Sequence, residues 1–215
     1  MLLIFNIFEL GIKEGEKNAY VAVGKNNITK SVFNDKGTLG MYLVQEKENP
    51  NMTYMFEVYE DEKSYQEHIK SEQYKEFLRQ SPIILTNHKK KIQVMPEYMG
   101  DKKFVQTRNT RLNYVTVDVK EGFNDTFREI VLDEMKQSIK KEEGVYVIYA
   151  ATAIGNPNKS YFFEIYENEK AYQKHRKTTH FKKYIEQTEN IIENKEFINI
   201  EGIKLLNKGN LNYVK

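Results

Sequence analysis

The chain carries the same residue pattern twice. Segment 56–68 reads FEVYEDEKSYQEH, and segment 163–175 reads FEIYENEKAYQKH, so that the two copies are offset by 107 residues. The same offset aligns shorter matches without a gap: Asn6 with Asn113, 13–15 with 120–122, Gly37 with Gly144, and 49–51 with 156–158. A solenoid repeat has roughly 20 to 50 residues, whereas roughly 100 residues suffice for a small domain with its own core. We therefore predict a duplicated domain, with copies at 1–106 and 107–215.

Composition supports two globular domains and excludes several kinds of site. Hydrophobic residues make up 40% of the 215 residues, and the net charge at pH 7 is only +2. Such a balance provides no large basic field for nucleic acid or an anionic membrane. The chain has no Cys, which excludes disulfides, thiolate metal sites and cysteine nucleophiles and is typical of the reducing cytoplasm. We predict a cytoplasmic protein that binds neither nucleic acid nor membranes, and we interpret the apolar segment 2–8 as a first strand.

Each half has the same predicted order of elements. The stretch 121–141 has apolar residues at helical spacing, and Gly144 is expected to end that helix by adopting a positive φ. A second helical stretch begins near Asn168 and breaks near 178–179. In the second half the predicted strands are 112–119, 145–153, 160–166 and 196–205. In the first half the predicted order is strand 2–10, helix 16–34, strands 39–47 and 53–59, helix 61–80 and strand 90–98.

The βαββαβ order predicts an α+β fold made of two tandem ferredoxin-like repeats. Each repeat would have a four-stranded antiparallel sheet with both helices on one face. In the predicted strands, as in 54–59, large apolar residues occupy the positions that point to each face of the sheet. The face away from the helices should therefore also be buried. We predict that the repeats pack sheet to sheet as an intramolecular α/β barrel, a pseudo-dimer within one chain. Pairing of this barrel with another copy stays open.

The segment 163–175, followed by TTHFK at 178–182, resembles the signature of the antibiotic-biosynthesis monooxygenase domain. The resemblance covers essentially the whole chain as two copies and is stronger in the second. That family typically forms dimeric barrels and includes quinol monooxygenases and a haem-degrading branch. The resemblance implies oxygenation of a small aromatic or quinol by dioxygen without a cofactor, because the deprotonated substrate itself activates dioxygen. The protein would supply a base, hydrogen-bond donors and a dry pocket.

Two histidines of the second copy are the candidate proton acceptors or oxyanion donors. His175 lies one helical step from Tyr172 and is repeated as His68, so it could instead hold the helix to the sheet. His180 fits the family signature, whereas its counterpart is Gln73. This difference predicts that the second half is the catalytic one.

Three pairs of strand residues complete the candidate site. Glu164 and Glu57 stand between large apolar neighbours, and each needs a partner or a raised pKa; His175 and His68 are the expected partners. Glu164 is predicted to orient a catalytic His. The predicted substrate-binding residues are Asn113, Tyr166, Asn6, Glu57, Tyr59 and His68, although for the Asn and Tyr residues a structural role in the strands and core is the favoured alternative.

Two cofactor-dependent alternatives and one non-catalytic alternative remain. Haem is disfavoured because the chain has no Trp and no His late in either second helix, although His175 or His180 could be ligands. A metal site made of His175, His180 and Glu164 is disfavoured because the two histidines are five residues apart, a poor spacing on one helix. The non-catalytic alternative is a small-ligand-binding barrel that has lost the chemistry.

Overall fold

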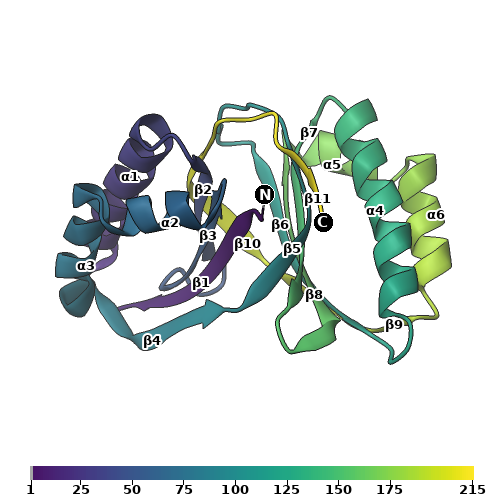
Figure 1. Ribbon diagram of the computed structural model, residues 1–215, viewed down its shortest axis with the longest axis horizontal. Coiled ribbons are helices and arrows are strands. Elements are labelled where there is room, and N and C mark those ends of the chain that lie inside the picture. Colours follow the sequence, from purple (N-terminus) through teal and green to yellow (C-terminus); the bar gives the residue numbers. More distant parts are fainter. Residues whose placement is uncertain (1) are drawn as a thin grey trace. The chain divides into compact units, whose positions relative to one another are not determined.

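The computed structural model describes residues 2–215, which form two compact units (Figure 1). The first unit contains the chain up to Val94 together with Phe104–Gln106 and Ile200–Gly209. The second unit contains Met95–Lys103, Thr107–Asn199 and Asn210–Lys215. Each unit therefore consists of one sequence repeat plus a segment taken from elsewhere in the chain.

The first unit is a five-stranded antiparallel sheet with helices on one face (Figure 1). Its elements are β1 (Ile4–Ile12), α1 (Lys17–Asn34), β2 (Thr38–Glu46), β3 (Met52–Tyr59), α2 (Glu62–Ile69), α3 (Glu72–Ile84), β4 (Leu85–Ile92) and β10 (Ile200–Asn207). The sheet order is β10-β2-β3-β1-β4. Buried Tyr20, Ile28 and Val32 of α1 pack with apolar residues of the strands, because they recur on one face of the helix.

The second unit has the same core with a six-stranded sheet. Its elements are β5 (Val94–Asp101), β6 (Arg111–Val119), α4 (Asn124–Lys141), β7 (Val145–Ala153), β8 (Asn156–Tyr166), α5 (Glu169–His175), α6 (Thr179–Thr188), β9 (Ile192–Ile198) and β11 (Asn212–Val214). The sheet order is β11-β5-β7-β8-β6-β9. Phe127, Val131 and Met135 of α4 lie in the core against the sheet. No helix between residues 2 and 215 has both the length and the apolar character needed to cross a membrane.

The two repeats exchange one strand each. Strand β5 follows β4 along the chain, yet it lies beside β7 in the second sheet. Strand β10 follows β9, yet it pairs with β2 of the first sheet, with Leu205 opposite Tyr42. Gln106 also contacts β10, since its side chain donates to the carbonyl of Gly202 and accepts from the amide of Leu205.

The predicted α+β class and the duplicated ferredoxin-like repeats are confirmed, with differences in detail. The strand predicted at 90–98 is the end of β4 and most of β5, and the one predicted at 196–205 is likewise divided between β9 and β10. Both divisions occur where the chain leaves one sheet for the other, and a continuous β pattern does not reveal that change of partner. Sheet-to-sheet packing and the domain boundary at 106 and 107 stay predictions.

Local caps explain the remaining differences between prediction and structure. The helix predicted at 61–80 is two helices, because the Ser71 hydroxyl accepts from the amide of Tyr74 and starts α3. Thr178 starts α6 in the same way, at the predicted break.

The expectation for Gly144 is wrong, since it does not have a positive φ. A Cβ there would lie 2.6 Å from Cβ of Ala171 in α5, so Gly144 permits the close approach of that helix. The aligned Gly15 and Gly122 do have positive φ, at 82° and 84°.

Candidate functional site

A cavity lies inside the second unit, between its three helices and the sheet. It encloses about 490 Å³, part of which is open to solvent. Most of its wall is apolar, with Val131, Phe162 and Phe181 among the lining residues. The lining residues with polar side-chain atoms, two tyrosines included, are Asn113, Glu134, Glu164, Tyr172, His175, Tyr184 and Lys195. An apolar cavity with a few convergent polar groups is the usual form of a small-molecule site.

Neighbouring strands position Glu164 in this cavity. Asn113 of β6 stands opposite Glu164 of β8, and its Nδ2 donates to Oε2 of that carboxylate at 2.8 Å. The Tyr166 hydroxyl donates to the same oxygen at 2.9 Å. Tyr166 is fully buried and does not line the cavity, and burial together with the charge of Glu164 holds its pKa well above the usual range. Tyr166 is therefore a neutral donor that orients Glu164.

The expected pairing of Glu164 with His175 is wrong. Within residues 2–215, the hydrogen-bond partners of the Glu164 side chain are Asn113 and Tyr166, and both donate to Oε2. The other oxygen, Oε1, has no hydrogen bond to this part of the chain. A carboxylate held at one oxygen and open at the other can accept a hydrogen bond or a proton from a ligand.

His175 and His180 instead belong to a cluster with Glu134 and Glu142, here called the histidine–glutamate cluster. Oε1 of Glu142, just after α4, lies 3.0 Å from Nδ1 of His175 and 2.7 Å from Nε2 of His180. Nε2 of His175 lies 3.7 Å from Oε1 of Glu134, which also accepts from the Ser138 hydroxyl at 2.7 Å. All four cluster side chains are at most 9% exposed.

Burial and charge set the ionisation of the cluster. Burial raises the pKa of Glu134 to about 7, because neighbouring His175 and Ser138 offset the loss of water only in part. Burial alone would raise the pKa of Glu142, but the hydrogen bonds from His175 and His180 outweigh it and lower that pKa. For His175 burial acts to lower the pKa, yet the Glu142 hydrogen bond and the surrounding carboxylates raise it.

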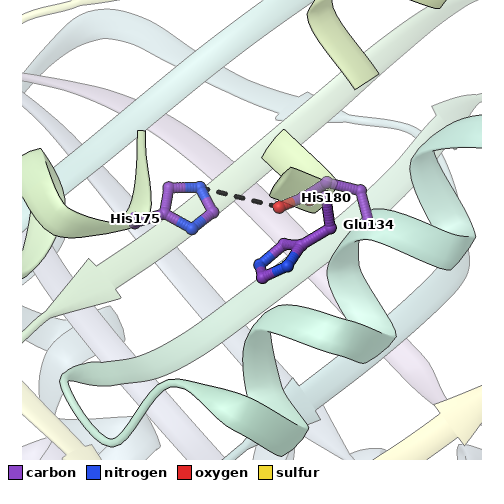
Figure 2. A group of neighbouring side chains, drawn as sticks. All are labelled: Glu134, His175 and His180. Atoms are coloured by element: carbon purple, nitrogen blue, oxygen red, sulfur yellow. Dashed lines mark ion pairs between the residues drawn. The ribbon is translucent and has the colours of Figure 1, made fainter. Parts of the chain in front are cut away.

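Figure 2 shows that Glu134, His175 and His180 converge from α4, α5 and α6. One ligand atom from each lies within 4.8 Å of the others, so these three residues could hold a metal ion. The sequence prediction named Glu164 in place of Glu134. It also discounted the site on helical spacing, which does not apply because α5 ends at His175 and α6 begins at Thr179.

The first repeat has a reduced version of this cluster. The 107-residue offset aligns Asn27 with Glu134, Asp35 with Glu142, and Gln73 with His180. The Gln73 amide donates to the Asp35 carboxylate at 3.1 Å, and Nδ1 of His68 lies 3.6 Å from it. Burial lowers the pKa of His68, and Asp35 offsets this only in part. The same histidine therefore has opposite pKa shifts in the two repeats.

The strand residues of the first repeat match those of the second repeat more closely than the cluster residues do. Glu57 stands opposite Asn6, and its Oε2 accepts from the Tyr59 hydroxyl at 2.9 Å. Nδ2 of Asn6 is buried without a hydrogen-bond partner, unlike that of Asn113. Asn6, Glu57, Tyr59 and His68 thus lie together in the first unit but not in the cavity of the second.

Sequence reasoning missed three residues of the site: Glu134, Glu142 and Lys195. Lys195 of β9 lines the cavity, and its Nζ donates to the Tyr184 hydroxyl at 3.4 Å. Burial lowers the pKa of Lys195, with Glu164 acting in the opposite direction. A usable signal was the replacement of neutral Asn27 by ionisable Glu134 on the apolar face of an aligned helix. His180 is not among the cavity-lining residues and is linked to His175 through Glu142.

Comparison with protein families decides the classification of this chain. The family model described as antibiotic biosynthesis monooxygenase matches residues 3–80 and again 112–187. The chain belongs to the antibiotic biosynthesis monooxygenase family. The resemblance inferred from the sequence is thereby confirmed for both copies. The matches include both strand pairs that carry Glu57 and Glu164.

Two solved structures share this tandem architecture, and each is described as a "putative monooxygenase". The one from Lactobacillus acidophilus NCFM is 28% identical, with a TM-score of 0.94 over 99% of this chain and 100% of its own. The one from Fusobacterium nucleatum is also 28% identical, with a TM-score of 0.93 over 100% of this chain and 98% of its own. Among curated proteins, none matches this chain significantly.

Proposed function

We propose that the second repeat is a cofactor-independent monooxygenase site for a small aromatic or quinol-type substrate. The observation that carries this proposal is the cavity in which Asn113, Glu164, His175 and Lys195 meet beside apolar and aromatic lining residues. Membership of the monooxygenase family supports the reaction class. A cytoplasmic location and the absence of haem stay predictions.

The proposed reaction balances without an external reductant. The substrate loses a proton, and the resulting electron-rich anion reduces dioxygen. One oxygen atom enters the substrate, and the other leaves as water with two hydrogens of the substrate. The protein then needs a proton acceptor, a donor for the developing anion and exclusion of bulk water.

Three residues of the cavity match these needs. Glu164 is the proposed proton acceptor, because Asn113 and Tyr166 hold one oxygen and leave the other open. Lys195 is the proposed donor to the substrate anion, since it lines the same cavity as Glu164. His175 and His180 are assigned a supporting role, because Glu142 holds both rings.

The active half is proposed from the differences between the repeats. The first repeat keeps Asn6, Glu57 and Tyr59, but it has neutral Asn27 and Gln73 where the second repeat has Glu134 and His180. The strand register places Lys89, opposite Leu10, where the second repeat has Lys195 opposite Val117, and Lys89 is exposed whereas Lys195 is half-buried. The first-repeat residues are accordingly not part of the proposed site.

The test is oxygen uptake by purified protein with a panel of quinols and polyphenols, and mass spectrometry of products formed under oxygen-18-labelled dioxygen. Glu164→Gln should lower turnover by about 100- to 10,000-fold, the range for loss of a general base. Glu57→Gln makes the same change in the first repeat and should retain activity. No uptake with any substrate would favour the ligand-binding barrel, and uptake that requires added haem would favour the haem-degrading alternative.

A further inference from the structure

We propose that Glu134, His175 and His180 form a binding site for one first-row divalent transition-metal ion, such as Zn²⁺, which joins the three helices covering the cavity. Glu134 belongs to α4, His175 ends α5, and His180 lies in the first turn of α6 (Figure 2). Two imidazoles and one carboxylate are a donor set that suits such ions better than Mg²⁺ or Ca²⁺. The site goes beyond the proposed oxygenation, in which Glu164 and Lys195 act on the substrate and His175 and His180 have only a supporting role.

The distances between donor atoms are compatible with such an ion. Zn²⁺ binds nitrogen and oxygen ligands at about 2.0–2.2 Å, so two donors around a tetrahedral ion lie about 3.3–3.6 Å apart. Nε2 of His175 and Oε1 of Glu134 are 3.7 Å apart. The ligand atoms of all three residues lie within 4.8 Å of one another, so closure on an ion needs only small side-chain rotations.

Glu142 provides a carboxylate that can hold both histidine rings in orientation. A metal-binding His usually donates its other ring N–H to a carboxylate, which fixes the ring orientation. Oε1 of Glu142 contacts Nδ1 of His175 and Nε2 of His180. The nitrogens left for an ion are therefore Nε2 of His175 and Nδ1 of His180, and the former already lies towards Glu134.

The first repeat shows that the fold does not need this donor set. Asn27 and Gln73 occupy the positions of Glu134 and His180, while the flanking Ser31 and Asp35 keep the chemistry of Ser138 and Glu142. Burying Glu134 near Glu142 is unfavourable even though His175 lies within ion-pair distance of both carboxylates, so a cluster that the fold does not need calls for another explanation. A bound cation adds positive charge to this cluster.

A surface groove gives an ion a route to the site. It lies beside α4 and α6, encloses about 580 Å³ including space open to solvent, and is lined by Glu134 and His180 themselves. Glu129 and Asp133 line the same groove, so its entrance carries negative charge that attracts cations. Lys183 is the cationic residue among the lining residues.

The test is titration of chelator-treated full-length protein with Zn²⁺ by calorimetry and with Co²⁺ by visible absorption. We expect saturation at one ion per chain, and nitrogen-ligand absorption bands for Co²⁺. His180→Gln and Glu134→Asn install the residues that the first repeat has at these positions, so the fold should be retained, as checked by circular dichroism. Each should weaken binding more than Glu142→Gln, for which about 10- to 100-fold is expected.

Two matched variants control for other histidines. His68→Gln changes the aligned residue of the first repeat and should leave the stoichiometry at one. His88→Ala removes the His88–Glu9 pair, in which the histidine is exposed, and so controls for adventitious binding there. The proposal is wrong if the wild type shows no saturable binding up to about 100 μM, or if folded His180→Gln binds as tightly as the wild type. Neither result depends on oxygen uptake, so this proposal and the proposed function can fail separately.

Discussion

Glu57 makes the stability of the first unit depend on pH in a predictable direction. Burial raises the pKa of its carboxyl from 4.5 to about 7, and the Tyr59 hydroxyl lowers it only in part. The folded state therefore holds this proton more tightly than the unfolded state does. The stabilisation is complete below about pH 4.5 and is lost as the pH rises through about 7.

The size of the effect follows from the two pKa values. One pKa unit corresponds to about 1.4 kcal/mol, so the whole shift corresponds to about 3 kcal/mol, most of which is lost between pH 5 and pH 8. Glu57→Gln removes the titrating group but keeps its shape. The difference in free energy of unfolding between wild type and variant should therefore change by about 2–3 kcal/mol across this range.

Urea unfolding at several pH values, followed by circular dichroism, measures this difference. Subtracting the variant cancels the contributions of all other titrating groups if they are unaffected by the substitution. Glu14→Gln makes the same substitution at an exposed position of the first unit and serves as the surface control. A wild-type minus Glu57→Gln difference that varies by less than about 0.5 kcal/mol would refute the assigned burial of a protonatable carboxyl.

Three further perturbations test other parts of the structure. Removal of metal by a chelator should lower the melting temperature but leave oxygen uptake unchanged, because the proposed reaction uses no metal; a loss of both would contradict the cofactor-independent mechanism. Gly37→Ala should destabilise by about 1–3 kcal/mol in thermal or urea unfolding, since the new Cβ would lie 2.4 Å from Cβ of Ser64, and an unchanged stability would mean that α2 can shift freely. Residues 1–106 expressed alone should aggregate, as judged by light scattering, because β2 loses its partner β10; a stable monomer would show that β10 is dispensable.

The sequence predicted the fold well where the information is local. The helical spacing in 121–141 and the strand 145–153 are properties of contiguous residues, and both elements appear in the structure. The exchange of β5 and β10 was not predictable in this way. Both strands continue the pattern of the strand before them, and only long-range pairing distinguishes their sheets.

The candidate site was only partly predictable, because part of it is formed by residues far apart in the sequence. His175 and Glu164 were predicted because they lie in segment 163–175, which repeats segment 56–68. Glu134 and Glu142 are 41 and 33 residues from His175 along the chain, and the two copies differ at both positions. Similarity between the two copies therefore does not reveal these residues. The change from neutral Asn27 to ionisable Glu134 does point to Glu134.

The exchanged strand β10 sets an order for folding during protein synthesis. The first sheet needs Ile200–Asn207 beside β2, although β4 is already complete at Ile92. At roughly 5–20 residues per second, the ribosome needs roughly 6–23 s to add the intervening residues. Throughout that time the β2 edge has unpaired backbone groups, a state in which other chains can pair with it. Rapid folding of the first repeat therefore leaves this edge open until residues 200–207 emerge from the ribosome.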